Sequence, residues 1–473
     1  MKITAKYVVL VICIVWLGAC KVPVVSSKQE NKVTPITYNS SQDTLNSAKM
    51  KWKSYFKEPQ LIALIDTALA HNQELNITLR EIEISKNEVR ARKGEYLPFI
   101  HLGGAAGLDK AGKFTWDGFS EDDLKENPEK GPKYVGDFKI GSFLSWELDV
   151  WKKLRNAKKA AVLRYLATIE GKNFMVTNLI SEIASSYYEL MALDNLLGII
   201  KQNIELQDNA LQIVKLQKEA AKVSQLAVNR FEAQLLYTKN LQFEIQQKVI
   251  ETENRINFLT GRFPQKVTRN AAVFNHVTID FIAAGVPSQL LQNRPDIHQA
   301  ELELEAAKLD VKVARANFYP SFSIQAGLGF QGFNPTYLLK PESLIYNLTG
   351  DLVAPLVNKN AIKATYFNAN EKQIQAVFNY ERSILNAHIE VVNQLSRIDN
   401  FSKSYETKAK EVDILTQSIT ISNNLFSSAR ADYIEVLSTQ REALDAKIDL
   451  IEIKLKQLDA QVNIYKALGG GWN

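Results

Sequence analysis

The chain contains an internal duplication. Residues 68–108 have a counterpart in residues 290–330, at an offset of 222 residues, so that Leu75 matches Ile297 and Pro98 matches Pro320. In each half, a helical segment is followed by a strand, a loop, a second strand and two long helices. We therefore expect two structural repeats, residues 51–261 and 290–473, joined by a linker at 262–289.

Four short segments alternate between apolar and polar residues, at about 97–108, 138–150, 320–333 and 344–357. A period of two predicts a strand with one apolar and one polar face. In the third segment, the apolar positions are Phe322, Ile324, Ala326, Leu328 and Phe330, and the intervening positions hold Ser, Gln and Gly. In the second segment, 138–150, Phe143 is an exception, because it is an aromatic residue on the face that is otherwise polar.

These strands favour a membrane barrel over a soluble β-sandwich, which would alternate in the same way. Each strand has about ten residues, the length that a tilted strand needs to cross a bilayer. Four strands do not close a barrel alone, and lipid does not tolerate open sheet edges. We therefore expect several copies to share one barrel, with the apolar face toward lipid and the polar face lining a pore.

The remaining chain is predicted to be mainly long helix. Residues 152–217 contain no Pro, and apolar residues recur every seven positions at Ile183, Leu190, Leu197, Ile204 and Leu211. A second seven-residue pattern, broken only by Arg441, comprises Ile434, Leu437, Leu444, Ile448, Ile451, Leu455, Leu458, Val462 and Tyr465. Such repeats indicate coiled coils. We expect antiparallel helical hairpins that turn at about 220–224 and 427–432, either packed only within one subunit or also forming the wall of a helical tube.

The N-terminus resembles a lipoprotein signal. Lys2 and Lys6 precede an apolar run of about ten residues, which is too short to span a bilayer. Residues 1–19 are predicted to be a signal peptide, and Cys20 a lipidated first residue of the mature chain. The alternative is a plain signal peptide followed by a chance Cys. Residues 20–50 are polar and without clear period, so we expect an extended tether.

Composition argues against catalysis and nucleic-acid binding. The formal net charge is +5, with basic and acidic residues interspersed, which gives no nucleic-acid footprint. The five His residues are scattered and lack metal-ligand spacing. The chain has no G-x-S-x-G motif and no phosphate-binding loop. We predict no enzyme activity, no cofactor and no metal site.

Taken together, these segments resemble the TolC-like outer membrane factors, in the lipoprotein branch that serves tripartite efflux systems of the resistance-nodulation-division type. The resemblance is carried by residues 52–75, 145–161, 285–324, 432–444 and 465–472, most strongly around Arg294-Pro295-Asp296. It implies a mainly α fold with a membrane β-barrel: a homotrimer whose twelve-stranded barrel takes four strands from each chain, and a tube of helical hairpins in the periplasm. The implied partners are outer membrane lipid, a periplasmic adaptor protein and an inner-membrane pump.

The resemblance also suggests site residues at the two hairpin turns. Ala221 and Ser224 in the first turn, and Ala429, Arg430 and Asp432 in the second, are candidates for adaptor docking or gating. Asp432 has a structural alternative, because Glu435 follows three residues later as in a capping box. Relatives commonly have Gly where this chain has Lys152, Ala221 and Ala429. Two further stretches have structural readings: Pro295 and Asp296 suit a helix start, and residues 109–137 suit an external loop.

The predicted function is a passive, gated outer membrane conduit that exports drugs, metals or other small molecules. Two alternatives remain open on the sequence. The chain could be the exit duct of a protein secretion system, or a structural coiled-coil lipoprotein that would have no use for the four alternating strands.

Overall fold

The computed structural model describes residues 22–38, 45–110, 135–277, 283–428 and 430–472. Cys20 and Ala429, two of the predicted site residues, lie outside the described residues, as do residues 111–134 of the predicted external loop.

The helices and strands occur in a similar order in the two halves of the chain, which we call the first and second repeat. The first repeat contains α2 (Trp52–Tyr55), α3 (Pro59–His71), α4 (Gln73–Tyr96), β1 (Phe99–Asp109), β2 (Val135–Leu148), α6 (Lys153–Glu219) and α7 (Gln225–Leu259). The second contains α8 (Leu290–Asn293), α9 (Pro295–Ala316), β3 (Ser321–Gly332), β4 (Leu344–Val353), α10 (Asn360–Ser427) and α11 (Tyr433–Ala467). Five short 3₁₀ helices are η1 (Ser47–Lys49), η2 (Ala271–His276), η3 (Pro287–Gln289), η4 (Pro335–Tyr337) and η5 (Pro341–Ser343).

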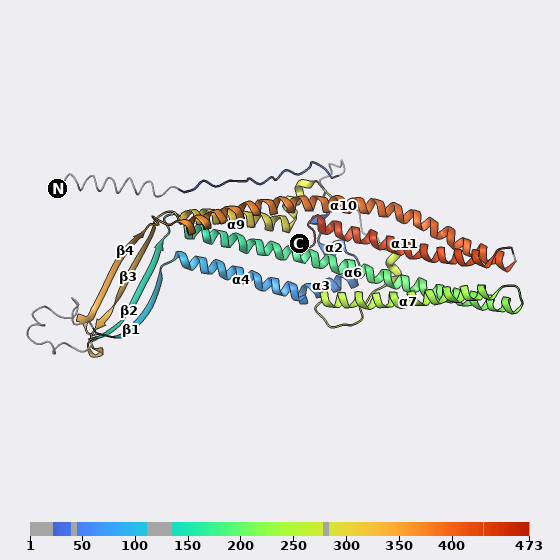
Figure 1. Cartoon of the computed structure of the whole chain (residues 1–473), viewed down its shortest axis with the longest axis horizontal. Coiled ribbons are helices and arrows are strands. Elements are labelled where there is room, and N and C mark those ends of the chain that lie inside the picture. The colour runs from blue at the N-terminus through green and yellow to red at the C-terminus, as the bar shows by residue number, and fades with distance from the viewer. Residues whose placement is uncertain (1–21, 39–44, 111–134, 278–282, 429, 473) are drawn as a thin grey trace, which may run out of the picture. The chain divides into compact units, whose positions relative to one another are not determined.

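The four strands form one antiparallel sheet in the order β1-β2-β3-β4 (Figure 1). Each repeat supplies one pair of strands, and β2 joins β3 across the duplication, with Gly141 opposite Gly329. Within the described chain, the outer edges of β1 and β4 have no partner strand. The mainly helical fold with a small antiparallel sheet is therefore confirmed.

The chain divides into two compact units, and both repeats contribute to each. One unit holds the sheet and consists of residues 1–29, 83–166 and 302–378. The other consists of residues 30–82, 167–301 and 379–473 and holds the paired parts of the long helices. No helix in the described ranges is both long and apolar enough to cross a membrane.

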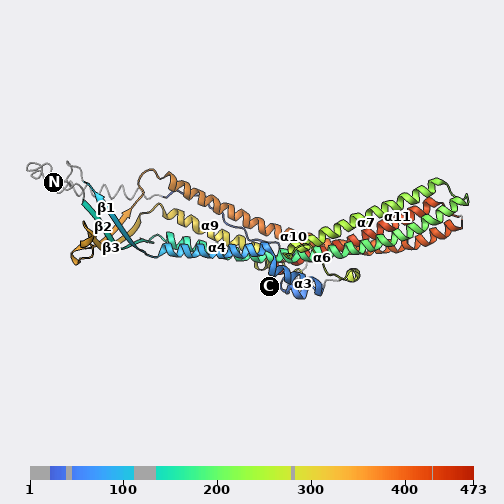
Figure 2. The same cartoon turned by 90° about the horizontal axis from the view of Figure 1, so that it is seen from below.

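In the second unit, α6 with α7 and α10 with α11 form two antiparallel hairpins (Figure 2). The seven-residue pattern of α6 points into their core, since Ile183, Leu190 and Leu211 are buried. From Leu444 onward, the residues of the α11 pattern are buried or half-buried. Ile434, at the start of the pattern, is exposed. Tyr55 of α2 stacks on Tyr465 of α11, with ring centroids 4.1 Å apart, so the short N-terminal helices close this core.

The passage from β2 to α6 is built around Asp149. Its carboxylate accepts hydrogen bonds from the backbone N–H groups of Leu154 and Arg155, at 2.9 Å each, and from the Arg155 guanidinium at 3.0 Å. Lys152 lies between them with φ 60°, a left-handed conformation that glycine adopts without strain. This geometry explains why Gly suits the position at which the chain carries Lys152.

Residues 22–38 of the N-terminal segment form no helix or strand, and they pack against the folded chain. In the first unit, Val22 and Val25 contact a small core of Ala314, Phe318 and Tyr366. In the second unit, the backbone N–H of Asn31 donates to Glu381 Oε1 at 3.1 Å, and Lys32 Nζ lies 2.7 Å from Glu301 Oε1. These contacts give the segment defined positions on both units.

Candidate functional site

The first hairpin turn, residues 220–224, ends α6 with a Schellman motif. The backbone N–H of Lys222 donates to Gln217 O at 2.9 Å, and that of Ala221 donates to Lys218 O at 2.9 Å. Ala221 has φ 54°, the left-handed conformation that this motif requires. Ser224 then caps α7, because its hydroxyl accepts from the N–H of Ala227 at 3.4 Å.

The second turn, residues 427–432, shares one hydrogen bond of this pattern. The N–H of Arg430 donates to Leu425 O at 2.8 Å, the same six-residue spacing as the bond from Lys222. Arg430 thus corresponds to Lys222, and Asp432 to Ser224. Each turn therefore presents one cation and, two residues later, one helix-capping position.

Asp432 occupies the N-cap of α11 without capping it through its side chain. Its backbone is extended, at φ −82° and ψ 153°, but the carboxylate makes no capping hydrogen bond. The capping box with Glu435 is thus not formed. Arg430 and Asp432 are both exposed, and no ion pair joins either of them to another described residue. Both charged groups are consequently available to solvent or to another molecule.

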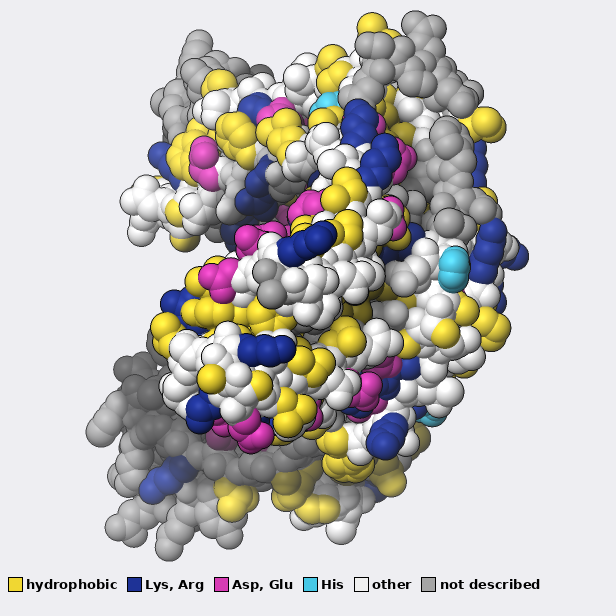
Figure 3. Space-filling view, turned by 90° about the vertical axis from the view of Figure 1, so that its right-hand side faces the viewer, with side chains coloured by type: hydrophobic (Ala, Val, Ile, Leu, Met, Phe, Trp, Pro, Cys, Tyr) yellow, Lys and Arg dark blue, Asp and Glu magenta, His cyan; other side chains and the backbone are white. Residues whose placement is uncertain are grey.

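Charged and apolar side chains are interspersed on the face that carries the hairpin turns (Figure 3). Basic and acidic groups alternate there, rather than forming one patch of a single sign. A surface of this kind favours recognition of a protein partner over attraction of a polyanion.

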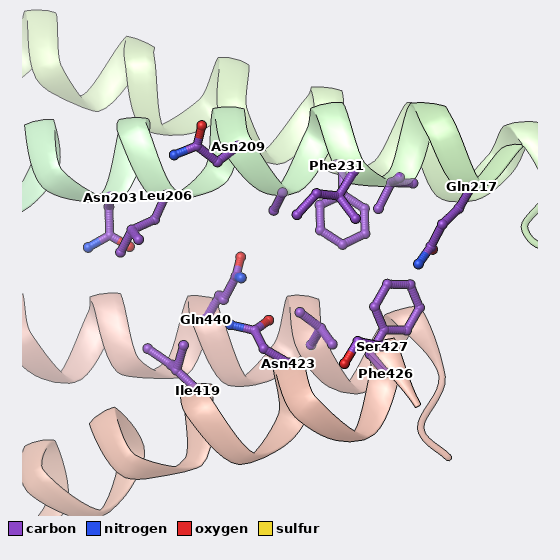
Figure 4. Close-up of a pocket in the computed structure, with 14 residues that line it drawn as sticks. Asn203, Leu206, Asn209, Gln217, Phe231, Ile419, Asn423, Phe426, Ser427 and Gln440 are labelled. Carbon is purple, nitrogen blue, oxygen red and sulfur yellow. The ribbon is translucent and has the colours of Figure 1, made fainter. Parts of the chain in front are cut away.

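A groove of about 290 Å³ lies between the two hairpins near their turns. Phe231 and Gln217 lie on its α6–α7 side, and Phe426 and Gln440 on its α10–α11 side (Figure 4). Its lining is Asn203, Leu206, Asn209, Ala210, Ile213, Val214, Gln217, Phe231, Ile419, Asn423, Phe426, Ser427, Val436 and Gln440. The groove thus combines apolar walls with five carboxamide groups.

Gln440 contributes an unsatisfied hydrogen-bond acceptor to the groove. It is only 6% exposed, and its Oε1 has no hydrogen-bond partner. A buried amide oxygen without a partner costs about 1–3 kcal/mol. The sequence predicts no groove here, although it holds one signal: polar Gln440 adjoins Arg441, the break in the apolar pattern of α11.

The sheet carries mostly apolar side chains on one face and mostly polar side chains on the other, with Phe99, Phe143, Ile345 and Val353 as the apolar exceptions on the polar face. Strand register places Leu102, Ile140, Leu328 and Leu344 on one face, where Leu102 is 85% exposed and Tyr346 82% exposed. The opposite face carries Asp137, Lys139, Phe143, Glu147, Gln325, Gln331, Asn347 and Asp351. Such an exposed apolar face requires a nonaqueous neighbour.

Within the described residues, no group of His, Cys, Asp or Glu side chains could hold a metal ion. Two acidic groups on the polar face of the sheet are instead engaged with amides. Gln331 Nε2 donates to Asp137 Oδ1 at 2.7 Å, and Gln325 Nε2 donates to Asp351 Oδ2 at 3.3 Å.

We expect Ala221→Gly to raise the free energy of unfolding by roughly 0.5–1 kcal/mol. Relief of the left-handed conformation contributes about 1–2 kcal/mol, and the greater freedom of glycine in the unfolded chain offsets about 0.4–1 kcal/mol of it. Equilibrium denaturation followed by circular dichroism measures the change. Ala220→Gly is the matched control, because Ala220 makes a helical bond to Leu216 O and should lose roughly 0.5–1 kcal/mol. Equal shifts in both variants would contradict the assignment.

Known proteins share this sequence pattern and this architecture. A sequence model described as outer membrane efflux protein matches residues 64–262 and 286–470. The chain is 26% identical over 433 residues to the solvent efflux pump outer membrane protein SrpC of Pseudomonas putida, covering 91% of this chain and 90% of that protein. It is 25% identical over 451 residues to the probable outer membrane lipoprotein SilC of Salmonella typhimurium, covering 95% and 93%. The fold matches the open-state MtrE outer membrane channel of Neisseria gonorrhoeae with a TM-score of 0.83, at 20% identity, over 96% of this chain and 99% of that one.

Proposed function

Because the chain belongs to the outer membrane efflux protein family, we propose that it forms the outer-membrane channel of a tripartite efflux pump. In this role it is a passive conduit, and the inner-membrane pump supplies the energy. The relative named for efflux of solvents supports a small-molecule cargo over a secreted protein.

The observation that carries this proposal is the four-stranded sheet with two unpaired edges and an exposed apolar face. The hydrocarbon of a bilayer accepts such a face, but it does not accept open edges. If β1 of one copy pairs with β4 of the next, three copies close a barrel of twelve strands. Strands of 11 and 10 residues at these edges have the length needed to cross the membrane.

The trimer would also cover apolar side chains on the helices. On α7, Leu236, Phe243 and Ile250 recur every seven residues and are all exposed in the single chain. On α10, Ile414 and Ile421 show the same spacing and exposure. Seven-residue spacing keeps such rows directed at a partner helix, so they support contact between copies.

Lipidation of Cys20 would hold the chain at the same membrane. Val22, two residues later, packs in the small core that contains Phe318, and Phe318 precedes β3 by three residues. The first described residues after Cys20 therefore lie near the start of a barrel strand. This placement supports an acyl anchor that enters the leaflet from which the barrel strands begin.

We propose that the hairpin turns and the groove between them receive the periplasmic adaptor. The unpaired amide oxygen of Gln440 and the apolar walls around it suit a helical segment that supplies both apolar side chains and hydrogen-bond donors. Ala221, Ser224 and Ala429 would belong to this docking region, and Arg430 and Asp432 would also serve the gate.

Charge reversal at the second turn tests the proposed channel. We expect Asp432→Lys and Arg430→Glu each to raise single-channel conductance in a planar bilayer. Copies of Asp432 around a threefold axis would repel one another and bind cations, and charged links near the turn would hold the mouth narrow. Lys222→Glu is the matched control, since it reverses the corresponding cation of the first turn. If neither variant of the second turn changes conductance, these residues are not part of the gate. If the wild-type protein forms no conducting oligomer, the proposed function itself is wrong.

A further inference from the structure

We infer that Phe143 determines the free width of the barrel lumen at the height of this residue. Two glycines leave space for its ring to lie close against the polar face of the sheet. This inference rests on the proposed function, because it requires that the polar face line a pore. It assigns a role to the one aromatic residue that breaks the polar pattern of β2.

Phe143 belongs to a single row that crosses all four strands. The strand register places His101 of β1 opposite Phe143, Phe143 opposite Gly327 of β3, and Gly327 opposite Asn347 of β4. Residues paired across antiparallel strands point to the same face. The phenyl ring thus lies on the polar face, with a glycine opposite it on one neighbouring strand.

The two glycines leave the space that the ring occupies. A β-carbon at Gly327 would lie 3.1 Å from Phe143 Cδ1 and 2.3 Å from Asn347 Oδ1. A β-carbon at Gly103 would lie 3.3 Å from Phe143 Cε2. One edge of the ring therefore lies next to β3 and the other next to β1. Each edge is close to the place that a β-carbon would take at the glycine. Any larger residue at either position has to displace the ring or share its space.

Two further side chains contact the ring from the same face. Lys139 Nζ lies 5.2 Å from the ring centroid, within range of a cation–π interaction, and the His101 ring centroid lies 5.6 Å away. Phe99 stacks on His101 in turn, with centroids 5.6 Å apart. These contacts favour the low position of the ring over rotamers that point away from the sheet.

In a trimer, the row would recur three times at one level of the barrel. Three rings that lie against the wall leave the lumen wide, whereas three displaced rings would stand in the path of solutes. The glycines thereby allow the chain to keep an aromatic surface in the lumen without blocking it.

Single-channel conductance in planar bilayers tests the inference. We expect Gly327→Val to lower conductance by an amount on the order of tens of per cent, because the valine displaces Phe143 into the lumen. Phe143→Ala should raise conductance above wild type and leaves both glycines unchanged. In the double variant Gly327→Val/Phe143→Ala, conductance should return to the wild-type value or above it.

Gly107→Val is the matched control for added bulk. Gly107 lies on the same face of β1, and a β-carbon there would have its nearest neighbour at 3.8 Å, in ordinary contact. This variant should therefore change conductance less than Gly327→Val does. The inference is overturned if Phe143→Ala leaves conductance unchanged, or if Gly327→Val lowers it equally with and without Phe143. In both cases the wild-type channel still conducts, so the proposed function survives.

Discussion

Replacing Arg294 with alanine is expected to lower the free energy of unfolding by about 3–5 kcal/mol, the cost of removing one partner from a buried ion pair. Arg294 is 3% exposed and joins three helices. Its guanidinium contacts the carboxylate of Asp296 at 2.6 and 2.9 Å, Glu390 Oε2 at 2.6 Å and Ala467 O at 3.0 Å. Removal leaves the half-buried carboxylate of Asp296 and the backbone carbonyl of Ala467 without their donor.

The charge state of Arg294 follows from the same contacts. Burial by itself lowers the pKa of the guanidinium. The hydrogen bonds and charges of Asp296 and Glu390 raise it by more than burial lowers it, so the net pKa is above its ordinary value. The group is consequently charged at every pH at which the protein is folded. No pH dependence of stability near neutrality should arise from Arg294 itself.

Urea denaturation at one fixed protein concentration measures this cost, because the stability of the proposed trimer would depend on concentration. Arg255→Ala is the matched control. Arg255 also faces two carboxylates, those of Glu182 and Glu189, but it is 51% exposed, so its loss should cost less than about 1 kcal/mol. Arg294→Lys should fall between wild type and Arg294→Ala, because it keeps the charge but not the paired hydrogen bonds to Asp296. Similar losses at Arg294 and Arg255 would refute the prediction.

The second large effect is expected at Gly329, where valine should abolish the assembled channel. A β-carbon at Gly329 would lie 2.4 Å from Ile140 O and 2.7 Å from Gly141 Cα, which are both backbone atoms of β2. Backbone atoms in a paired strand have no rotamer by which to move away. The substitution therefore forces β2 and β3 apart, at the junction between the strand pairs of the two repeats.

Heat-modifiable migration of the detergent-extracted protein reports this loss, since an assembled barrel resists unfolding by detergent until it is heated. Gly329→Val should migrate as unassembled chain without heating. Gly350→Val in β4 is the control, because no heavy atom of the described residues, apart from its chain neighbours, would lie within 4 Å of a β-carbon there. If Gly329→Val still forms a normal oligomer, β2 and β3 can accommodate the added side chain, and the prediction is wrong.

Several features of the candidate site could be predicted from sequence because their signals are local. The two turns have similar residues at fixed positions, and the structure shows the same six-residue hydrogen bond at both. Pro295 is the first residue of α9, as its fixed backbone angle predicts. The expected hydrogen bond in the capping box of Asp432 was wrong, however, because the motif does not determine the direction of the side chain at a turn.

Other features depend on residues far apart in the chain. Glu390 and Ala467 lie 96 and 173 residues from Arg294, and no motif links the three. The groove near the turns likewise forms from residues of α6, α7, α10 and α11, which become neighbours only when the two hairpins pack.

By itself, the sequence determined the duplication, the four alternating strands, the two faces of the sheet and the helical hairpins, since periodicity and turn chemistry act between residues close in the chain. Only the tertiary structure decided that Gly141 meets Gly329, that Phe143 lies between Gly103 and Gly327, and that Arg294 is buried among three helices. The physical reason is that strand register and helix packing set these contacts, and both are established between segments that the sequence pattern describes separately.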